Sequence, residues 1–264
     1  MNDRLRGKTV IITGATGGLG EQIAVRCAES GARLVLIARN GEKLERMKRE
    51  LGDRFSASVS AYAADLARRE EIETLFPKIE RETETVDCLV NNAGFGLFKT
   101  TQDITMEEAE NMFAVNVFAL MALTKFVLPA MLKQRSGHII NIASQAGKIA
   151  TPKAGVYAAT KSAVLSFTDS LRMEVKGTGV FVTAVNPGPM ATRFFQTADP
   201  SGTYVANLGR WIVPAEKVAE KIVGRMLTDT REINIPVPMN LAAKLHALFP
   251  SLVERVGKKA FYKK

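Results

Sequence analysis

The chain has 264 residues, of which 46% are hydrophobic, and a formal net charge of +9 at pH 7. This length and composition favour one large core in a single soluble domain. The charge suggests nucleic-acid binding, but the basic residues are spread over many predicted helix faces and no aromatic-basic recognition motif is visible, so we expect no nucleic-acid partner. The first residues lead directly into a predicted strand and predict no signal peptide.

Cysteine and histidine give no sign of a metal site. The chain has two cysteines, Cys27 in a predicted helix and Cys88 in a predicted strand, and two histidines, His138 and His246. They are not spaced like metal ligands, and thiols in such positions are usually small core residues. We therefore expect no metal, and we expect the protein to work in a reducing cytoplasm.

Strands and helices alternate along the chain. Short apolar runs predict strands at Thr9–Ile12, Arg33–Ala38, Ala57–Ala63, Cys88–Asn91, His138–Ile142, Val180–Val185 and Glu232–Ile235. Longer periodic patterns predict helices near Leu19–Ser30, Glu42–Leu51, Arg69–Glu82, Met106–Lys133, Val156–Lys176 and Ala215–Leu227. This order predicts an α/β fold: a single doubly wound, Rossmann-type domain with a parallel seven-stranded sheet. Ligands of such sheets bind outside the carboxyl ends of the strands.

A glycine-rich turn, Thr13–Gly20, lies between the first predicted strand and the first predicted helix. This arrangement brings backbone N–H groups and a helix N-terminus up to the pyrophosphate of a dinucleotide. The alternative, an ordinary strand-to-helix turn, stays open on this motif alone.

Tyr157 and Lys161 are four residues apart in a predicted helix, so they share one face. A free tyrosine ionises near pH 10, which is too high for proton transfer at neutral pH, and a nearby ammonium favours the phenolate. The pair therefore suggests an acid/base catalyst, although most Tyr-x-x-x-Lys pairs are surface pairs.

Further motifs stand in order around these two. Asp65 follows the third predicted strand, Asn91–Gly94 ends the fourth, Ser144 closes the fifth and Pro187–Thr192 follows the sixth. With the glycine turn and the Tyr157 pair, the first 190 residues or so resemble the short-chain dehydrogenase/reductase family.

The resemblance implies a set of site residues. The implied catalytic residues are Asn116, Ser144, Tyr157 and Lys161. Tyr157 would transfer the proton, Ser144 would hydrogen-bond the substrate oxygen, and Asn116 would hold a water that links Lys161 to solvent. The implied cofactor-binding residues are Gly14, Thr16, Gly18, Leu19, Gly20, Arg39, Asp65, Leu66, Asn92, Ala93, Gly94, Tyr157, Lys161, Pro187, Gly188 and Thr192.

Arg39 decides the expected cofactor. It follows the second predicted strand, where an NAD enzyme carries an acid for the ribose 2′-hydroxyl. A guanidinium can bind a 2′-phosphate in bidentate fashion, so we expect NADP(H) to be preferred over NAD(H). Gly17 departs from the family pattern, because many NADP-using relatives have a basic residue there. Arg39 could instead be a solvated charge at a strand end.

The substrate is expected to be hydrophobic. The resemblance implies a lid over the substrate at about residues 189–213. This segment carries Phe194, Phe195, Tyr204 and Trp211, and Phe95 and Phe98 are expected nearby. These aromatics suggest a pocket for a small ketone, aldehyde or 3-oxoacyl compound, or they pack the lid onto the sheet.

We expect an NADP(H)-dependent oxidoreductase. The alternative is a catalytically idle redox sensor that binds the dinucleotide and acts through a partner.

The predicted helix Met106–Lys133 is apolar on nearly every side. Its segment from Met112 to Leu132 contains Asn116 and Lys125 and fits a buried helix better than a membrane span. A helix apolar on every side must be buried on every side. We therefore expect a homodimer or homotetramer, in which this helix pairs with its own copy and with Val164, Leu165 and Phe167 of the next helix.

The last residues, 239–264, read as an amphipathic basic extension of the catalytic domain, which spans 1–238. Apolar residues recur at helical spacing at Leu241, Leu245, Leu248, Phe249, Leu252, Val253 and Val256. Pro250 interrupts this pattern, and lysines cluster at the end. Such a segment suits weak contact with a membrane surface. A helix packed on its own domain or on a neighbouring subunit is the alternative.

Overall fold

A computed structural model describes residues 2–202 and 209–257 of the chain. The strands are β1 (Thr9–Thr13), β2 (Arg33–Ala38), β3 (Val59–Ala63), β4 (Cys88–Asn91), β5 (Gly137–Ile142), β6 (Val180–Pro187) and β7 (Glu232–Ile235). They form one seven-stranded sheet in the order β3-β2-β1-β4-β5-β6-β7, and all paired strands are parallel. The predicted doubly wound α/β fold is confirmed.

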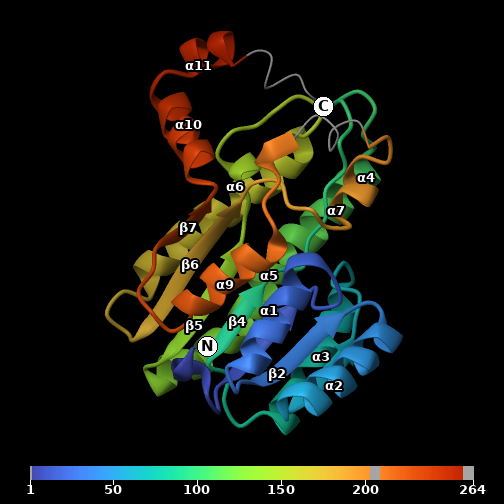
Figure 1. The fold of residues 1–264 in the computed structure, drawn as a ribbon, viewed down its shortest axis with the longest axis vertical. Coiled ribbons are helices and arrows are strands. Elements are labelled where there is room, and N and C mark those ends of the chain that lie inside the picture. The colour runs from blue at the N-terminus through green and yellow to red at the C-terminus, as the bar shows by residue number, and fades with distance from the viewer. Residues whose placement is uncertain (1, 203–208, 258–264) are drawn as a thin grey trace.

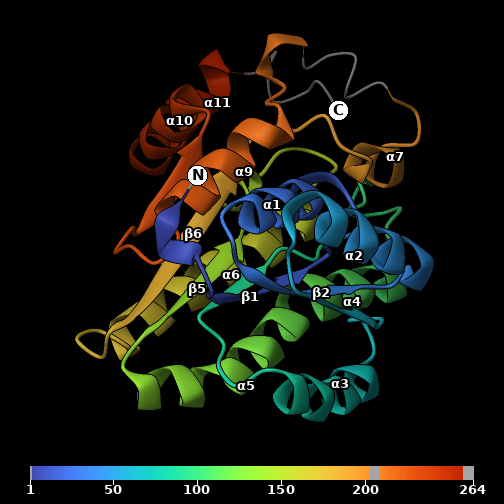
Figure 2. The same ribbon diagram turned by 60° about the horizontal axis from the view of Figure 1, so that its bottom comes forward.

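Helices cover both faces of the sheet (Figures 1 and 2). They are α1 (Gly18–Glu29), α2 (Gly41–Phe55), α3 (Arg69–Glu82), α4 (Met106–Phe113), α5 (Ala119–Gln134), α6 (Gly155–Glu174), α7 (Phe194–Ala198), α9 (Ala215–Arg225), α10 (Val237–Leu248) and α11 (Pro250–Val256). Buried side chains of α1, α2 and α9 form one apolar core with the sheet, and those of α3, α5 and α6 form a second core on the opposite face. The inner strands β1, β2 and β4 are covered on both sides, so their sequences are nearly continuous apolar runs.

The chain reverses the direction of winding between β1 and β4. From β1 it winds outward to β3 at one edge, and from β4 it winds outward to β7 at the other. The connections that follow β1 and β4 therefore diverge, and a crevice opens at the carboxyl ends of these two neighbouring strands. The predicted strand boundaries differ little from those observed. The third strand begins at Val59 rather than Ala57, and β6 continues to Pro187.

The predicted helix Met106–Lys133 is not a regular α-helix. Between α4 and α5 the segment Ala114–Phe118 forms a π-helical turn. By length and composition Met106–Gln134 could cross a membrane, a test that core helices of soluble proteins also pass. Here α5 lies against α3 and β5, and Leu123, Val127 and Met131 are buried in the core.

Contacts within one protomer bury some of the apolar residues that we expected at a subunit interface. Val164, expected at that interface, is fully buried against Val117, Leu120 and Ala143 of the same chain. This part of the prediction is wrong, because α6 packs directly on the helix before it. Phe118 is 61% exposed and keeps its side chain outside this cluster.

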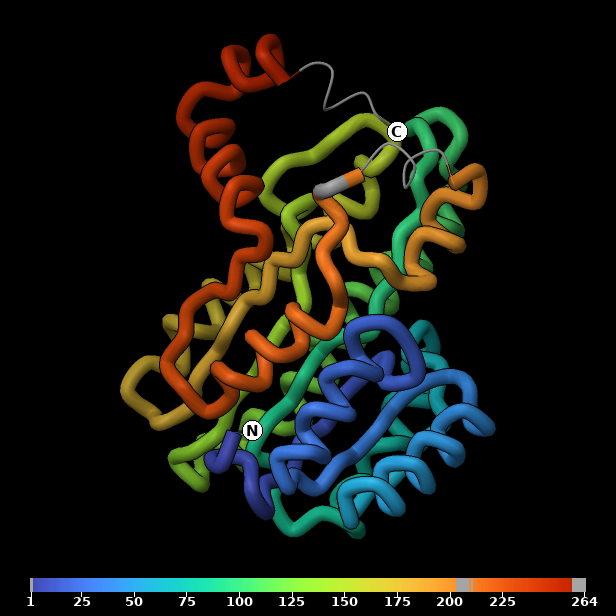
Figure 3. Tube along the Cα trace, in the orientation of Figure 1, coloured from blue at the N-terminus to red at the C-terminus, as the bar shows by residue number. Residues whose placement is uncertain are grey.

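The two last helices extend away from the sheet (Figures 1 and 3). Pro250 begins α11, and the chain bends at Phe249 between α10 and α11. Ala243 is the buried residue of α10, whereas α11 has none. The remaining lysine-rich end lies outside the described residues.

Candidate active site

A cavity of about 1160 Å³ opens at the carboxyl ends of the strands, at the crevice between β1 and β4. Nearly all of the predicted site residues line it: Gly14, Thr16, Gly18, Leu19, Arg39, Asp65, Leu66, Asn92, Ala93, Gly94, Ser144, Tyr157, Lys161, Pro187, Gly188 and Thr192. Gly20 and Asn116 do not line it, and both lie behind its wall.

The glycine turn has the backbone shape that a phosphate cradle needs. Gly14 and Gly18 have φ values of +63° and +52°, a region that residues with a Cβ rarely adopt. A Cβ on Gly20 would lie 2.4 Å from the carbonyl oxygen of Gly14, so glycine lets α1 pack directly under the turn. The N-cap, Gly17, offers no side-chain hydrogen bond to the first turn of α1. The first N–H groups of this helix are thus available for an anion, and the cradle fits a dinucleotide pyrophosphate.

Asn92 and Thr13 hold this turn in place. Asn92 Nδ2 donates to the carbonyl oxygens of Thr13 at 2.9 Å and Gly14 at 3.3 Å. In return, Thr13 Oγ1 accepts from the N–H groups of Asn92 and Ala93 at 3.0 Å and 2.9 Å. Across the cavity, a Cβ on Gly18 would lie 3.1 Å from the side chain of Thr192, so the glycine turn and the loop after β6 meet there.

Arg39 and Asp65 lie at the end of the cavity formed by β2 and β3. Arg39 is exposed at the carboxyl end of β2. Its neighbour Asn40 caps α2, since its side-chain oxygen accepts from the N–H of Lys43 at 2.8 Å. Asp65 Oδ1 accepts from the N–H of Ala67 at 3.0 Å, which fixes the turn after β3. The guanidinium is thus beside the cavity on a fixed backbone.

Tyr157 and Lys161 lie on the first turns of α6 and both are buried. Lys161 Nζ lies 5.9 Å from the centre of the Tyr157 ring, and it donates to the carbonyl oxygen of Ile142 at 2.8 Å. Burial lowers the pKa of Lys161 to about 8, so its charge persists at neutral pH. This puts an ammonium next to a phenol at one end of the cavity.

Asn116 lies in the π-helical turn, a feature often found at functional sites. Its Nδ2 donates to the carbonyl oxygen of Phe95 at 2.8 Å and to Thr160 Oγ1 at 3.0 Å, and its Oδ1 accepts from the N–H of Phe95 at 2.9 Å. Both amide hydrogens are therefore used within the protein. Asn116 fixes the loop after β4 against α6, while the expected water-holding role stays a prediction.

Ser144 follows β5 and begins a short 3₁₀ helix, Gln145–Gly147. Its Oγ accepts a hydrogen bond from the N–H of Ala146 at 3.0 Å. Because Ser144 Oγ only accepts in this hydrogen bond, its own O–H can still donate to another group. The hydroxyl thus supplies a donor at the cavity wall.

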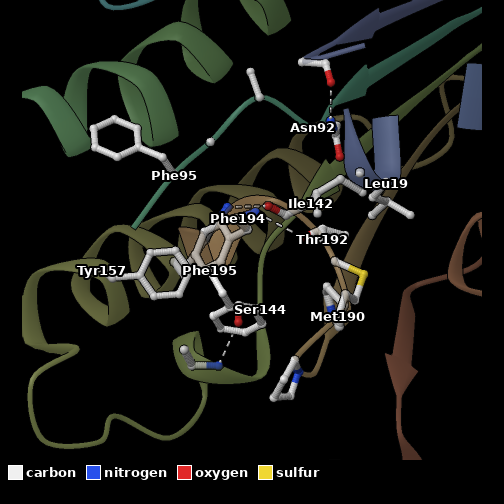
Figure 4. Close-up of a pocket in the computed structure, with 18 of the residues that line it drawn as sticks. Leu19, Asn92, Phe95, Ile142, Ser144, Tyr157, Met190, Thr192, Phe194 and Phe195 are labelled. Atoms are coloured by element: carbon white, nitrogen blue, oxygen red, sulfur yellow. Dashed lines mark hydrogen bonds between the residues drawn. The ribbon is translucent and has the colours of Figure 1, made fainter. Parts of the chain in front are cut away.

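Aromatic rings form the wall beside Tyr157 (Figure 4). The ring of Phe194 lies 5.4 Å from that of Tyr157 and 5.4 Å from that of Phe195, centre to centre. Phe98 contacts all three rings. These aromatics both line the cavity and pack α7 onto the loop after β4. The expected hydrophobic substrate stays a prediction. Tyr204 lies outside the described residues.

The last helices also contribute to the cavity. Pro238, Met239 and Ala242 of α10 line it. A Cβ on Gly188 would lie 2.8 Å from Cδ of Pro236 and 2.9 Å from Sδ of Met239, so the loop after β6 rests directly on the start of α10. The division of the chain at residue 238 stays a prediction, but the cavity spans that boundary.

Sequence reasoning missed two supporting threonines. Thr13 clamps the glycine turn, and Thr160 joins the site, since it accepts from Asn116 and donates to the carbonyl oxygen of Tyr157 at 2.7 Å. Thr160 is fully buried. The sequence did offer one sign of this role, because Thr160 is a polar residue on the same helix as Tyr157 and Lys161. Among the described residues, no group of three His, Cys, Asp or Glu side chains could hold a metal ion.

Known proteins share this architecture. A model of the short chain dehydrogenase family matches residues 8–201. An uncharacterized oxidoreductase of Staphylococcus aureus strain MRSA252 is 33% identical over 231 residues, which cover 88% of this chain and 95% of that protein. A short-chain dehydrogenase from Sphingobium yanoikuyae in complex with NADPH has a TM-score of 0.81 at 28% identity, over 96% of this chain and 95% of that one. A 3-ketoacyl-(acyl-carrier-protein) reductase from Brucella melitensis complexed with NADH has a TM-score of 0.77 at 28% identity, over 88% and 97% of the two chains. With this fold and these relatives, the chain belongs to the short-chain dehydrogenase/reductase family of oxidoreductases.

Proposed function

We propose that this protein uses NADP(H) to interconvert a carbonyl and an alcohol on a small hydrophobic substrate, such as a ketone, an aldehyde or a 3-oxoacyl compound. One observation carries the proposal. The Tyr157 phenol, the Lys161 ammonium and the Ser144 hydroxyl line one cavity whose neighbouring wall consists of Phe98, Phe194 and other apolar side chains.

Each of these groups has a role in a carbonyl reduction. NADPH would be held by the glycine turn, Arg39, Asp65 and the loop after β6, and it would supply the hydride to the carbonyl carbon. As negative charge gathers on the carbonyl oxygen, Tyr157 donates its proton to that oxygen and Ser144 donates a hydrogen bond to it. The ammonium of Lys161 stabilises the phenolate that is left. In the oxidative direction the Tyr157 phenolate takes the proton from the alcohol.

Supporting side chains keep these groups in register. Thr160 ties the carbonyl of Tyr157 to Asn116, and Asn116 ties α6 to the loop after β4. A Cβ on Gly96 of that loop would lie 2.8 Å from Cδ2 of Tyr157, so the backbone covers the tyrosine ring directly. Such close contact limits the motion of the phenol relative to the substrate.

The proposed preference for NADP(H) rests on Arg39. The family fold accommodates NADPH in the Sphingobium relative and NADH in the Brucella relative, so the fold alone does not select the cofactor. Arg39 lies at the cavity end where a 2′-phosphate is expected, on the strand end next to the Asn40 cap. A guanidinium there attracts the phosphate, whereas an acid would repel it.

The catalytically idle alternative is not favoured. A protein that only senses the dinucleotide has no use for a proton donor at the substrate end of the cavity. Here Tyr157, Lys161 and Ser144 all line that end.

We also propose a homodimer in the cytoplasm. Phe118 is largely exposed beside the half-buried Phe113 and Met121, which leaves an apolar surface on the π-helical turn and the start of α5. Pairing with a second copy through a two-fold axis would cover this surface.

The proposed cytoplasmic location rests on the cysteines. Both are buried thiols, which suits a reducing compartment.

Replacing Tyr157 by phenylalanine tests the proposal. The change removes only the phenolic oxygen, so NADPH affinity should stay within about threefold while turnover falls by at least about a hundredfold. The assay is NADPH consumption against a panel of ketones, aldehydes and 3-oxoacyl thioesters, with NADPH binding measured in parallel. Turnover within about tenfold of wild type would remove Tyr157 from the acid/base role.

A further inference from the structure

The last two helices expose many large apolar side chains. Large hydrophobic side chains on α10 and α11 and at the bend between them are 45–80% exposed: Val237, Leu241, Leu245, Leu248, Phe249, Leu252 and Val256. We call this set the C-terminal apolar face. Soluble monomers rarely expose contiguous apolar patches of this kind unless they mark a binding surface.

The helix geometry separates this face from the body of the protein. Residues of an α-helix are rotated by about 100° each, which places Val237, Leu241, Leu245 and Leu248 within roughly 80° of arc. Ala243 lies on the opposite side of α10 and is 4% exposed. The helix is thus held to the domain by one side and presents leucines on the other.

Specific contacts fix this orientation. Lys148 Nζ donates to Asn240 Oδ1 at 3.1 Å and forms an ion pair with Glu232 at 2.6 Å. The loop that begins at Ser144 is therefore bonded to both β7 and α10. His246 and Glu254 contact each other at 3.2 Å, which links α10 to α11. The apolar face is accordingly presented outward on a supported scaffold.

Charge selects the occupant of this face. From Val237 to the last residue the chain carries Lys244, Arg255 and four further lysines but only one acid, Glu254. Lys244 and Arg255 are exposed. A second copy seated on the same face by a two-fold axis would bring two such basic ends together, which is unfavourable. An anionic surface with an apolar layer beneath it complements both features.

We propose that α10 and α11 dock on the surface of an anionic lipid bilayer, with the C-terminal apolar face entering the boundary between headgroups and acyl chains. The first turns of α10 also line the candidate active-site cavity, through Pro238, Met239 and Ala242. Docking therefore brings the cavity next to the bilayer, where an apolar substrate is concentrated. The docking does not depend on the proposed catalytic role.

Cosedimentation of the full-length protein with vesicles tests this docking. The vesicles contain either phosphatidylcholine alone or phosphatidylcholine with an equal amount of phosphatidylglycerol, each at low and high salt. We expect sedimentation with the anionic vesicles at low salt, weaker sedimentation at high salt, and little with the neutral vesicles.

Matched variants separate the apolar contribution from the ionic one. Leu245→Ser with Leu248→Ser leaves the net charge unchanged and should raise the lipid concentration for half binding by at least about tenfold. Met173→Ser is the control, because Met173 is 71% exposed but lies at the far end of α6, near the start of β6. Lys244→Glu with Arg255→Glu should weaken binding by roughly fivefold per charge. Lys48→Glu with Arg49→Glu on α2 makes the same change in net charge elsewhere and should have little effect.

Three results would overturn the proposal. They are a protein that stays in the supernatant with anionic vesicles at low salt, a leucine variant that sediments like wild type, and a lipid-free dimer that the leucine variant abolishes. The last result would assign the face to a second copy. Thermal unfolding and NADPH binding of each variant show that the fold is intact, so a failure of docking is distinguishable from a failure of the proposed enzyme activity.

Discussion

Replacing Gly20 by alanine tests whether close packing of α1 under the glycine turn shapes the cofactor site. The new Cβ would lie 2.4 Å from the carbonyl oxygen of Gly14 and 2.6 Å from Nδ2 of Asn92. Real Cβ atoms do not approach other atoms so closely, and neither neighbour is the end of a flexible chain. Gly14 is backbone, and Asn92 is held by its bonds to Thr13 and Gly14. The turn and the helix must therefore move apart.

The expected cost follows from two opposing effects. Overpacking of a rigid site costs about 1–3 kcal/mol. Alanine in a helix contributes up to about 1 kcal/mol of stability relative to glycine. The free energy of unfolding should therefore fall by about 1–2 kcal/mol. Because the displaced turn carries the N–H groups for the pyrophosphate, dinucleotide affinity should fall by about tenfold or more, which equals about 1.4 kcal/mol.

Gly17→Ala is the matched control in the same turn. Gly17 has an extended φ of −167°, and a Cβ there would meet nothing within 4 Å. Because Gly17 is the N-cap of α1 and alanine is a poorer N-cap than glycine, the free energy of unfolding should fall by only about 0.5 kcal/mol, without displacement of the turn. Urea unfolding of both variants, with and without NADPH, gives the two quantities. A Gly20→Ala protein that is as stable as wild type and binds NADPH equally well would refute the packing argument.

Three further predictions concern cofactor, acid stability and assembly. Arg39→Asp should reverse the preference between NADPH and NADH by about 2 kcal/mol, measured by titration with each; a wild type that binds both equally would remove Arg39 from this role. Burial lowers the pKa of His138 to about 3, so the folded protein resists its protonation, and stability should fall as pH drops below the unfolded value of about 6.5 by up to about 1.4 kcal/mol per pH unit. His138→Gln should flatten this slope between pH 6 and 5, and parallel slopes for the two proteins would contradict it. Light scattering should find at least a dimer, and Phe118→Lys should weaken it; a stable wild-type monomer at micromolar concentration would exclude the proposed interface.

Most of the candidate site could be predicted from the sequence because its signals are local. The glycine turn is one short segment, and the spacing of Tyr157 and Lys161 is one helical turn. Asp65, Ser144 and Thr192 each follow a strand, and parallel strands bring their carboxyl ends to one edge of the sheet. An ordered series of strand ends therefore predicts a common cavity, which the structure contains.

The sequence was less informative about how each polar atom is bonded. The water-holding role expected of Asn116 stays a prediction, but nothing in the sequence indicated that its amide hydrogens bond Phe95 and Thr160. Those partners come from a loop and from another helix, and only their placement in space brings them within reach. The π-helical turn that carries Asn116 gave no signal either, because its composition is that of an ordinary apolar helix.

The sequence by itself determined the fold class, the order of the elements and the residues that meet at the cavity, since periodicity and turn chemistry act over a few residues. The tertiary structure alone decided which apolar side chains are covered. Val164 and Leu245 both belong to apolar helical stripes, yet Val164 is fully buried and Leu245 is 45% exposed. A stripe shows only that a helix has an apolar side. Whether that side is buried depends on which element packs against it: α6 meets the helix before it, whereas the outer side of α10 is covered by no described part of the chain.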